Sequence, residues 1–209
     1  MNPDPTDPHQ PIPRDRRLDP RETAVLIVDA QNSEIAPDIR AAKPAYAAAM
    51  RTRALPAMRR LIDTARARGC EIVYTVIESL TRDGRDRSLD HKLSGIFVPK
   101  GSPLAAVIAE VAPGPDDIVL PKTSSGVFNS TNLDYVLRNL GIRNVIVAGF
   151  LTDQCVDMAV RDGADRGYYM VCAHDACATH SPERHDGALK AFGGYCRVQS
   201  VDEALATIG

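Results

Sequence analysis

Short runs of apolar residues alternate with amphipathic stretches along most of the chain. The runs are continuous, as is typical of strands covered on both faces of a parallel sheet. We expect six strands, at 23–28, 71–76, 117–121, 144–149, 168–173 and 196–200. Helical spacing of apolar residues predicts helices near 55–65, 133–140, 156–163, 182–192 and 201–208. This alternation predicts an α/β fold: a three-layer α/β/α Rossmann-like domain with a six-stranded, mainly parallel sheet.

The first residues depart from this pattern, because they are polar and rich in proline. We expect residues 1–17 to form a disordered arm and residues 18–209 to form one domain. The arm has no apolar core, so we read it as neither a secretion signal nor a membrane anchor.

Net charge and cysteine usage narrow the class of protein. A net charge of −2 offers no attraction to nucleic acid or to anionic lipid, so we expect neither as a partner. Five cysteines without a framework spacing favour a reduced, cytoplasmic compartment. The first strand leads into "DAQN" and not into a glycine-rich loop, which disfavours nucleotide binding.

Three chemically active side chains follow strands of the predicted sheet. Asp29 follows the first strand, Lys122 the third and Cys155 the fourth. Ligands of open α/β sheets bind beyond the carboxyl ends of the strands, so we expect these groups to converge. A thiolate, a carboxylate and an ammonium form a set for covalent acyl transfer.

Cys155 falls where a helix should start, with Thr152 or Asp153 as its N-cap. Free N–H groups and the helix dipole would favour a thiolate there, and a nearby Lys122 would lower its pKa further. Taken alone, such a cysteine is more often a small buried hydrophobic residue, and a lone lysine is more often solvated. Catalysis is favoured because all three side chains follow the ends of predicted strands.

Three segments resemble the isochorismatase-like cysteine hydrolases, a superfamily that includes several amidohydrolases. They read "LIVDAQN", "PKTSSGVFNSTNLDYVLRNLGIRNVIVAGFLTDQCV" and "RGYYMVCAHDACAT", and the resemblance extends from Leu18 to the C-terminus. It implies that Cys155 is the nucleophile, that Asp29 is the general acid/base and that Lys122 lowers the thiol pKa. It also implies a cis peptide bond between Phe150 and Leu151, and an oxyanion hole formed by the N–H groups of Leu151 and Cys155.

The resemblance also bears on the substrate pocket. It places Gln31, Asn32 and Phe128 at positions that line the pocket, whereas their ordinary roles would be a turn, a cap and a core aromatic. Family members usually form dimers or tetramers, so a homodimer or homotetramer is expected.

The longest irregular stretch, at about 77–102, is expected to be functional. Arg82 and Glu78 in it offer a donor and an acceptor to a small polar substrate. Many nicotinamidases carry an Asp-x-His metal site after the second strand, where this chain reads "IESLTRDG". Glu78 alone is a poor zinc site, so we expect no metal and no other cofactor. The histidines and cysteines at 172–185 fit no common zinc spacing.

These features predict a cysteine-dependent amidohydrolase that cleaves a linear C–N bond in a small amide or ureido compound. Two alternatives stay open. One is hydrolysis of a vinyl ether, although isochorismatases with that activity commonly lack the cysteine. The other is a non-catalytic member of the fold.

Overall fold

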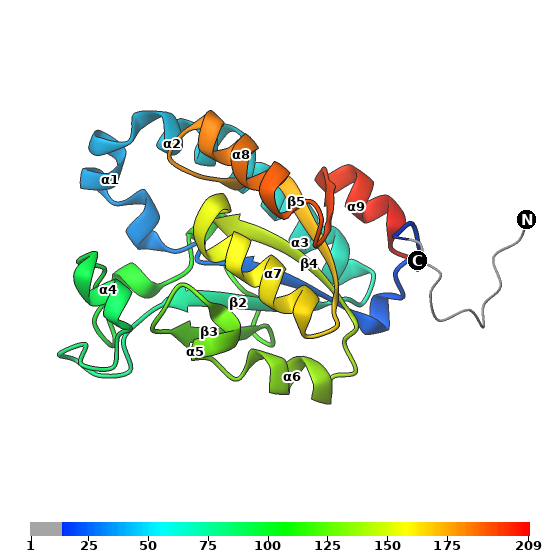
Figure 1. Cartoon of the computed structure of the whole chain (residues 1–209), viewed down its shortest axis with the longest axis horizontal. Coiled ribbons are helices and arrows are strands. Elements are labelled where there is room, and N and C mark those ends of the chain that lie inside the picture. Colours follow the sequence, from blue (N-terminus) through cyan, green and yellow to red (C-terminus); the bar gives the residue numbers. More distant parts are fainter. Residues whose placement is uncertain (1–13) are drawn as a thin grey trace, which may run out of the picture.

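A single parallel sheet forms the centre of the molecule. The structure, a computed structural model, describes residues 14–209. Its strands are β1 (Thr23–Val28), β2 (Glu71–Ile77), β3 (Ile118–Lys122), β4 (Asn144–Phe150), β5 (Tyr169–Ala178) and β6 (Arg197–Gln199). They lie in the order β3-β2-β1-β4-β5-β6, and every neighbouring pair is parallel (Figure 1). The predicted sheet is confirmed.

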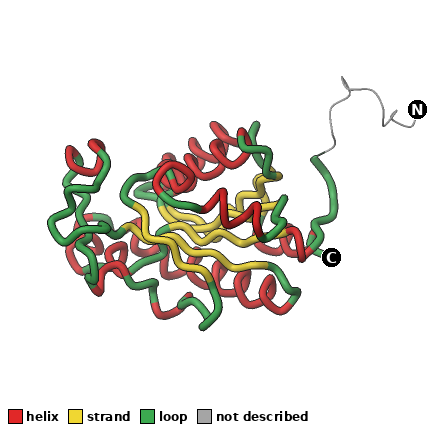
Figure 2. Tube along the Cα trace, turned by 90° about the horizontal axis from the view of Figure 1, so that it is seen from below, coloured by secondary structure: helices red, strands yellow, loops and turns green. Residues whose placement is uncertain are grey.

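Helices cover both faces of the sheet, which lies between them as a middle layer (Figure 2). The helices on one face are α1 (Pro37–Ala42), α2 (Pro44–Ala49), α3 (Leu55–Ala67) and α9 (Val201–Thr207). Those on the other are α5 (Val127–Ser130), α6 (Leu133–Asn139), α7 (Asp157–Asp165) and α8 (Pro182–Phe192). No helix within residues 14–209 is both long and apolar enough to cross a bilayer.

The central strand β1 shows why its sequence is a continuous apolar run. Val25 and Ile27 pack into the core on one face of the sheet, and Leu26 and Val28 pack into the core on the other. All six residues of β1 are buried, so no position has to be polar.

Two short helices after β1 were not expected from the sequence. The segment that forms α1 and α2 contains few large apolar residues, so it shows little helical periodicity. Pro37 and Pro44 begin these helices, where a missing N–H costs nothing. A π-helical turn at Met50–Ala54 then joins α2 to α3, in which Pro56 occupies one of the first two positions, where proline is tolerated.

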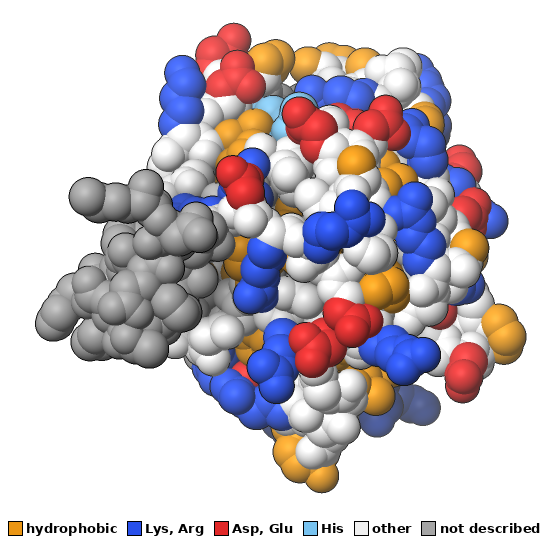
Figure 3. All heavy atoms as spheres, turned by 90° about the vertical axis from the view of Figure 1, so that its right-hand side faces the viewer, with side chains coloured by type: hydrophobic (Ala, Val, Ile, Leu, Met, Phe, Trp, Pro, Cys, Tyr) orange, Lys and Arg blue, Asp and Glu red, His pale blue; other side chains and the backbone are white. Residues whose placement is uncertain are grey.

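The expected disordered arm is only partly open to comparison. Residues 1–13 lie outside the described residues. Residues 14–17 contact the domain: the Arg16 guanidinium lies 4.2 Å from the centre of the Tyr169 ring, and Arg17 Nε donates to the Gly209 carbonyl at 2.5 Å. Acidic and basic side chains are interspersed over this end of the molecule (Figure 3).

Strands β1 and β4 approach each other most closely at Gly149, which pairs with Val28. Gly149 has a φ of +131°, a conformation that side chains rarely allow. A Cβ built there would lie 2.1 Å from the Val28 carbonyl oxygen. Only glycine therefore fits at this point, one residue from the end of β4.

We predict that Gly149→Ala lowers the free energy of unfolding by about 3 kcal/mol, through backbone strain and overpacking. Urea denaturation followed by circular dichroism would measure the change. Gly187→Ala is the matched control, because Gly187 lies within α8 and a Cβ there meets no atom within 4 Å. The free energy of unfolding of that variant should rise by about 0.5–1 kcal/mol. An equal loss of stability in both variants would contradict the requirement for glycine at position 149.

Candidate active site

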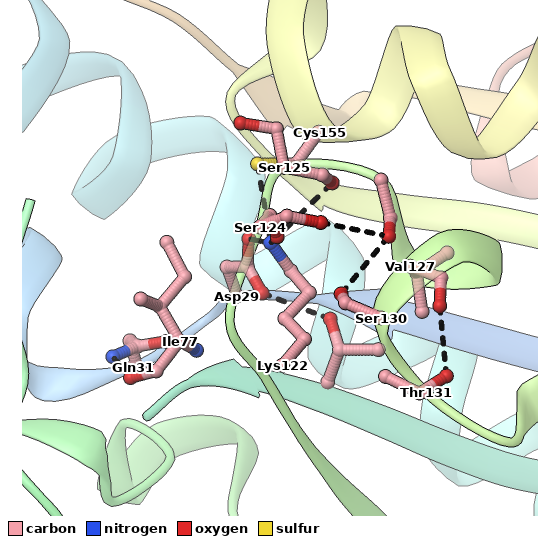
Figure 4. Close-up of polar contacts among 12 residues, drawn as sticks. Asp29, Gln31, Ile77, Lys122, Ser124, Ser125, Val127, Ser130, Thr131 and Cys155 are labelled. Atoms are coloured by element: carbon pink, nitrogen blue, oxygen red, sulfur yellow. Dashed lines mark hydrogen bonds and ion pairs between the residues drawn. The ribbon is translucent and has the colours of Figure 1, made fainter. Parts of the chain in front are cut away.

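Three polar side chains meet at the carboxyl ends of the central strands. Lys122 Nζ lies 2.9 Å from Asp29 Oδ2 and 3.4 Å from Cys155 Sγ (Figure 4). Asp29 follows β1, Lys122 ends β3 and Cys155 lies in the turn after β4. Because β2 separates β3 from β1, the lysine must span a distance of about 10 Å between strands, which a long side chain allows.

The backbone and carboxylate of Asp29 are both fixed by strand β2. Asp29 adopts the left-handed region, with φ at +52°, and its N–H donates to the Thr75 carbonyl at 3.0 Å. Thr75 Oγ1 donates to Asp29 Oδ1 at 2.9 Å, which leaves Oδ2 facing Lys122. Strained backbone of this kind is found where function requires one orientation.

Lys122 is fully buried, and acceptors surround its ammonium group. Besides Asp29 and Cys155, the carbonyl oxygens of Ser124 and Ser125 accept from Nζ at 2.8 and 3.4 Å. Burial disfavours the charged ammonium, but Asp29 and the Cys155 sulfur outweigh it and the pKa of Lys122 is raised. The buried group is therefore a cation beside a carboxylate.

The helix start around Cys155 differs from the one expected. A π-helical turn, Thr152–Val156, precedes α7, and its N-cap is Leu151, with no side-chain hydrogen bond. Thr152 Oγ1 instead bonds to His185 Nδ1 at 2.9 Å, and Asp153 accepts from Thr179 and Arg184. Neither predicted N-cap is correct, because both side chains are engaged by residues around α8.

The expectation of a resting thiolate is also wrong. Burial, and then the negative Asp29, raise the pKa of Cys155 to about 12, although Lys122 lowers it. Cys155 is only 5% exposed, so solvent would stabilise a negative charge on its sulfur only weakly. At neutral pH the site therefore holds a neutral thiol beside a Lys122–Asp29 ion pair.

The backbone next to Cys155 departs from regular helical geometry. The peptide bond between Phe150 and Leu151 is cis, which confirms that prediction. The Leu151 carbonyl accepts from the N–H groups of Gln154 and Val156, at 3.1 and 3.2 Å, and passes over that of Cys155.

A cavity of about 730 Å³ opens over the thiol. Its walls come from the segment after β1, from α4 (Leu89–Leu93), and from the turn and helix after β4. In Figure 1, α1 and α4 lie at the same end of the molecule, one above the other. Polar residues on the walls include Asp29, Glu34, Lys43, His91, Asp153, Gln154, Cys155, Asp157, Arg161 and His180.

Two residues expected to line the pocket fasten the chain beside it instead. Gln31 is fully buried: its amide nitrogen donates to the Ile77 and Leu104 carbonyls at 3.0 and 3.2 Å, and its oxygen accepts from Ile77 N at 2.5 Å. Asn32 Nδ2 donates to the Pro103 carbonyl at 3.1 Å. With these groups engaged, neither residue lines the cavity.

The other three residues expected to bind the substrate, Glu78, Phe128 and Arg82, also lie away from the cavity. Glu78 Oε1 accepts from the Gly101 N–H at 2.7 Å. Phe128 is buried and stacks on Tyr168, with centroids 6.0 Å apart. Arg82 is exposed and is not among the residues around the cavity. The expectation that these side chains line the pocket is therefore not met.

Sequence reasoning missed several residues that do line the cavity. Glu34 and Lys43 come from the segment whose helices were not predicted, and His91 comes from α4 inside the expected irregular stretch. His180 lies two residues after the end of β5 and seven residues beyond the end of the strand predicted at 168–173, so the sequence did not place it at the end of a strand. Among residues 14–209, no cluster of three or more His, Cys, Asp or Glu is arranged to hold a metal ion.

Known proteins are similar to this chain in sequence and in fold. Residues 23–203 match the Isochorismatase domain family model. The chain is 30% identical to the ureidoacrylate amidohydrolase RutB of Rhizobium rhizogenes, over 91% of this chain and 85% of the relative. It is 32% identical to RutB of Agrobacterium fabrum, over 79% and 80%.

Solved structures with a similar fold include two hydrolases. A cysteine hydrolase from Pseudomonas syringae pv. phaseolicola superposes with a TM-score of 0.81 at 24% identity, covering 91% of this chain and 94% of its own. The N-carbamoylsarcosine amidase of Thermoplasma acidophilum superposes with a TM-score of 0.71 at 28% identity, covering 87% and 97%.

Opposite shifts of the thiol pKa should follow from changing its two charged neighbours. Asp29→Asn removes a negative charge and should lower the pKa of Cys155, whereas Lys122→Met should raise it further. Below its pKa a thiol gains thiolate tenfold per unit, so alkylation by iodoacetamide at pH 8 should be faster in Asp29→Asn and slower in Lys122→Met. Mass spectrometry would locate the modified cysteine, and a Cys155→Ala sample gives the background. Slower alkylation in Asp29→Asn would contradict the charge assignment.

Proposed function

The chain belongs to the isochorismatase family and is a hydrolase of carbon–nitrogen bonds other than peptide bonds. We propose that it uses Cys155 as the nucleophile and that its substrate is a small linear amide or ureido compound. The observation that carries the proposal is the contact of one buried ammonium with both a carboxylate and a thiol. A nucleophile, a base and a charge that orients them are the parts that covalent catalysis requires.

The reaction begins from the neutral thiol. As Cys155 attacks the substrate carbonyl, its proton passes to the carboxylate of Asp29, which the contact with Lys122 orients. The carbonyl oxygen becomes an oxyanion, which the N–H groups of Leu151 and Cys155 stabilise. Asp29 then gives the proton to the leaving nitrogen, the C–N bond breaks, and an acyl group remains on the sulfur.

Water completes the cycle. Asp29, again a carboxylate, takes a proton from a water molecule that attacks the thioester carbonyl. The second tetrahedral intermediate collapses, the C–S bond breaks, and the sulfur recovers the proton from Asp29. One water is consumed, and one acid and one amine or ammonia are released.

The nature of the scissile bond is supported by the cysteine and by the relatives. A thiol nucleophile serves acyl transfer, whereas a vinyl ether has no acyl carbon for it to attack. The names of two relatives, ureidoacrylate amidohydrolase and N-carbamoylsarcosine amidase, both describe cleavage of a carbonyl–nitrogen bond. We propose the same bond class here, in preference to vinyl-ether hydrolysis.

Loss of the nucleophile tests the proposal. Cys155→Ala should abolish ammonia release from a panel of ureidoacrylate, N-carbamoyl amino acids, biuret, maleamate and nicotinamide, with a fall in kcat of at least 10⁴-fold expected when a covalent route is removed. The wild type should act on at least one ureido or amide member faster than on nicotinamide, because the polar cavity walls need polar partners.

Cys70→Ala is the matched control, because Cys70 is a buried free cysteine that is not among the residues lining the cavity. It should keep wild-type turnover. Activity retained by Cys155→Ala, or a wild type that hydrolyses isochorismate and no member of the panel, would refute the proposed chemistry.

We also propose a homodimer or homotetramer that works in the cytoplasm. All five cysteines are free and buried, as suits a reducing compartment. Apolar side chains around α4 are unusually exposed, and they support contact with a second copy beside the cavity. They are Leu80, Leu89, Leu93 and Phe97, with Leu89 and Leu93 71% and 78% exposed.

Replacing both leucines of α4 should therefore reduce the mass in solution. The Leu89→Ser/Leu93→Ser variant should shift towards the monomer of 22.6 kDa in size-exclusion chromatography with light scattering. Tyr135→Ser serves as the control, because Tyr135 is 68% exposed on α6 and should not affect assembly. A wild type that elutes as a monomer would contradict the proposal.

A further inference from the structure

Two cations approach one histidine on the cavity wall. Lys43 Nζ lies 2.7 Å from His180 Nε2, and Arg184 Nη1 lies 3.2 Å from His180 Nδ1. Lys43 occupies the connection between α1 and α2, and His180 follows β5 just before α8. Segments distant in sequence thus bring an ammonium and an imidazole together beside the thiol cavity, which both residues line.

The cluster holds more hydrogen-bond donors than acceptors. Burial, and then the charges of Lys43 and Arg184, lower the pKa of His180, so the ring is neutral and carries one lone pair. Arg184 has a carboxylate partner in Asp153, to which its Nε donates at 2.5 Å. The Lys43 ammonium has three N–H donors, and among residues 14–209 the only hydrogen-bond partner of this group is the ring of His180.

No carboxylate of the described chain neutralises Lys43 directly. Within residues 14–209, none lies within 4.0 Å of its Nζ. Glu34 is the nearby acidic residue on the same wall, and its Oε2 already accepts from the Tyr46 hydroxyl at 2.7 Å. Lys43 therefore presents unused N–H donors and a positive charge to the cavity.

The position of the cluster is fixed relative to the nucleophile. The His180 ring lies edge-on to Tyr46, with centroids 5.5 Å apart, and Tyr46 in turn lies edge-on to Phe150, at 5.9 Å. Tyr46 is fully buried, and Phe150 ends the strand that leads into the turn of Cys155. This aromatic row holds the ammonium at a set distance from the thiol.

We propose that Lys43, oriented by His180, binds a carboxylate of the substrate. The substrate is then a short linear amide or ureido acid, with its scissile carbonyl at Cys155 and its carboxylate at the far wall. The assignment of the scissile bond rests on the proposed function above, whereas the carboxylate site rests on the donor surplus at Lys43.

Ligand binding to a variant that cannot turn over tests this site separately from catalysis. In the Cys155→Ala background, calorimetry would compare 3-ureidopropionate with 3-ureidopropionamide, and maleamate with maleamide. Each pair differs only in a carboxylate against a carboxamide. The acid of at least one pair should bind tenfold or more tightly than its amide, and adding Lys43→Met should remove that preference.

Two further variants separate recognition from structural support. Lys190→Met removes an exposed lysine of α8 and should leave the preference intact. Lys43→Arg keeps the charge and should restore a part of it. A preference for neither acid, or a preference that survives Lys43→Met, would overturn the inference. Wild-type enzyme that is inactive on ureido and amide compounds, with the acid preference intact, would instead refute the proposed reaction alone.

Discussion

The buried ion pair between Asp29 and Lys122 is the interaction on which the site depends. Removing two charges from water is costly, and hydrogen bonds with neighbouring groups offset part of that cost here. Thr75 holds one carboxylate oxygen, and the carbonyls of Ser124 and Ser125 accept from the ammonium. The pair holds the Asp29 carboxylate beside both the ammonium and the thiol.

Burial, and then the Asp29 carboxylate, explain why Cys155 rests as a thiol. A sulfur anion at Cys155 would be a second negative charge beside Asp29, in a site that holds one ammonium. In the proposed reaction, attack by the sulfur therefore requires that its proton move to the carboxylate as the carbon–sulfur bond forms. Reactivity is tied to the presence of a substrate carbonyl and is not a standing property of the cysteine.

The fold and the meeting of three polar side chains could be predicted because their signals are local and repetitive. Continuous apolar runs gave the six strands, and parallel strands carry Asp29, Lys122 and Cys155 to one edge. The cavity walls could not be predicted, because they depend on contacts between distant segments. Lys43 meets His180 across 137 positions, and neither residue has a neighbouring pattern that indicates the other.

The thiol pKa was mispredicted for a related reason. A helix start and a nearby lysine are visible in the sequence, whereas burial depth is not, and burial is the largest influence on Cys155. Gln31 shows the same limit. A polar residue after a strand looks available to a ligand, but the Ile77 and Leu104 backbones use its amide in full.

The hydrogen bonds of Gln31 anchor the segment that forms part of the cavity wall. Gln31 joins the end of β1 to both ends of the long segment that follows β2, at Ile77 and Leu104, and the Ile108 N–H donates to the Ala30 carbonyl at 2.9 Å. The segment is thus anchored at its two ends, while its middle, α4, forms part of the cavity wall. Insertions and substitutions between the anchors can reshape the wall without displacing Asp29, so selection can exchange specificity on an unchanged catalytic frame.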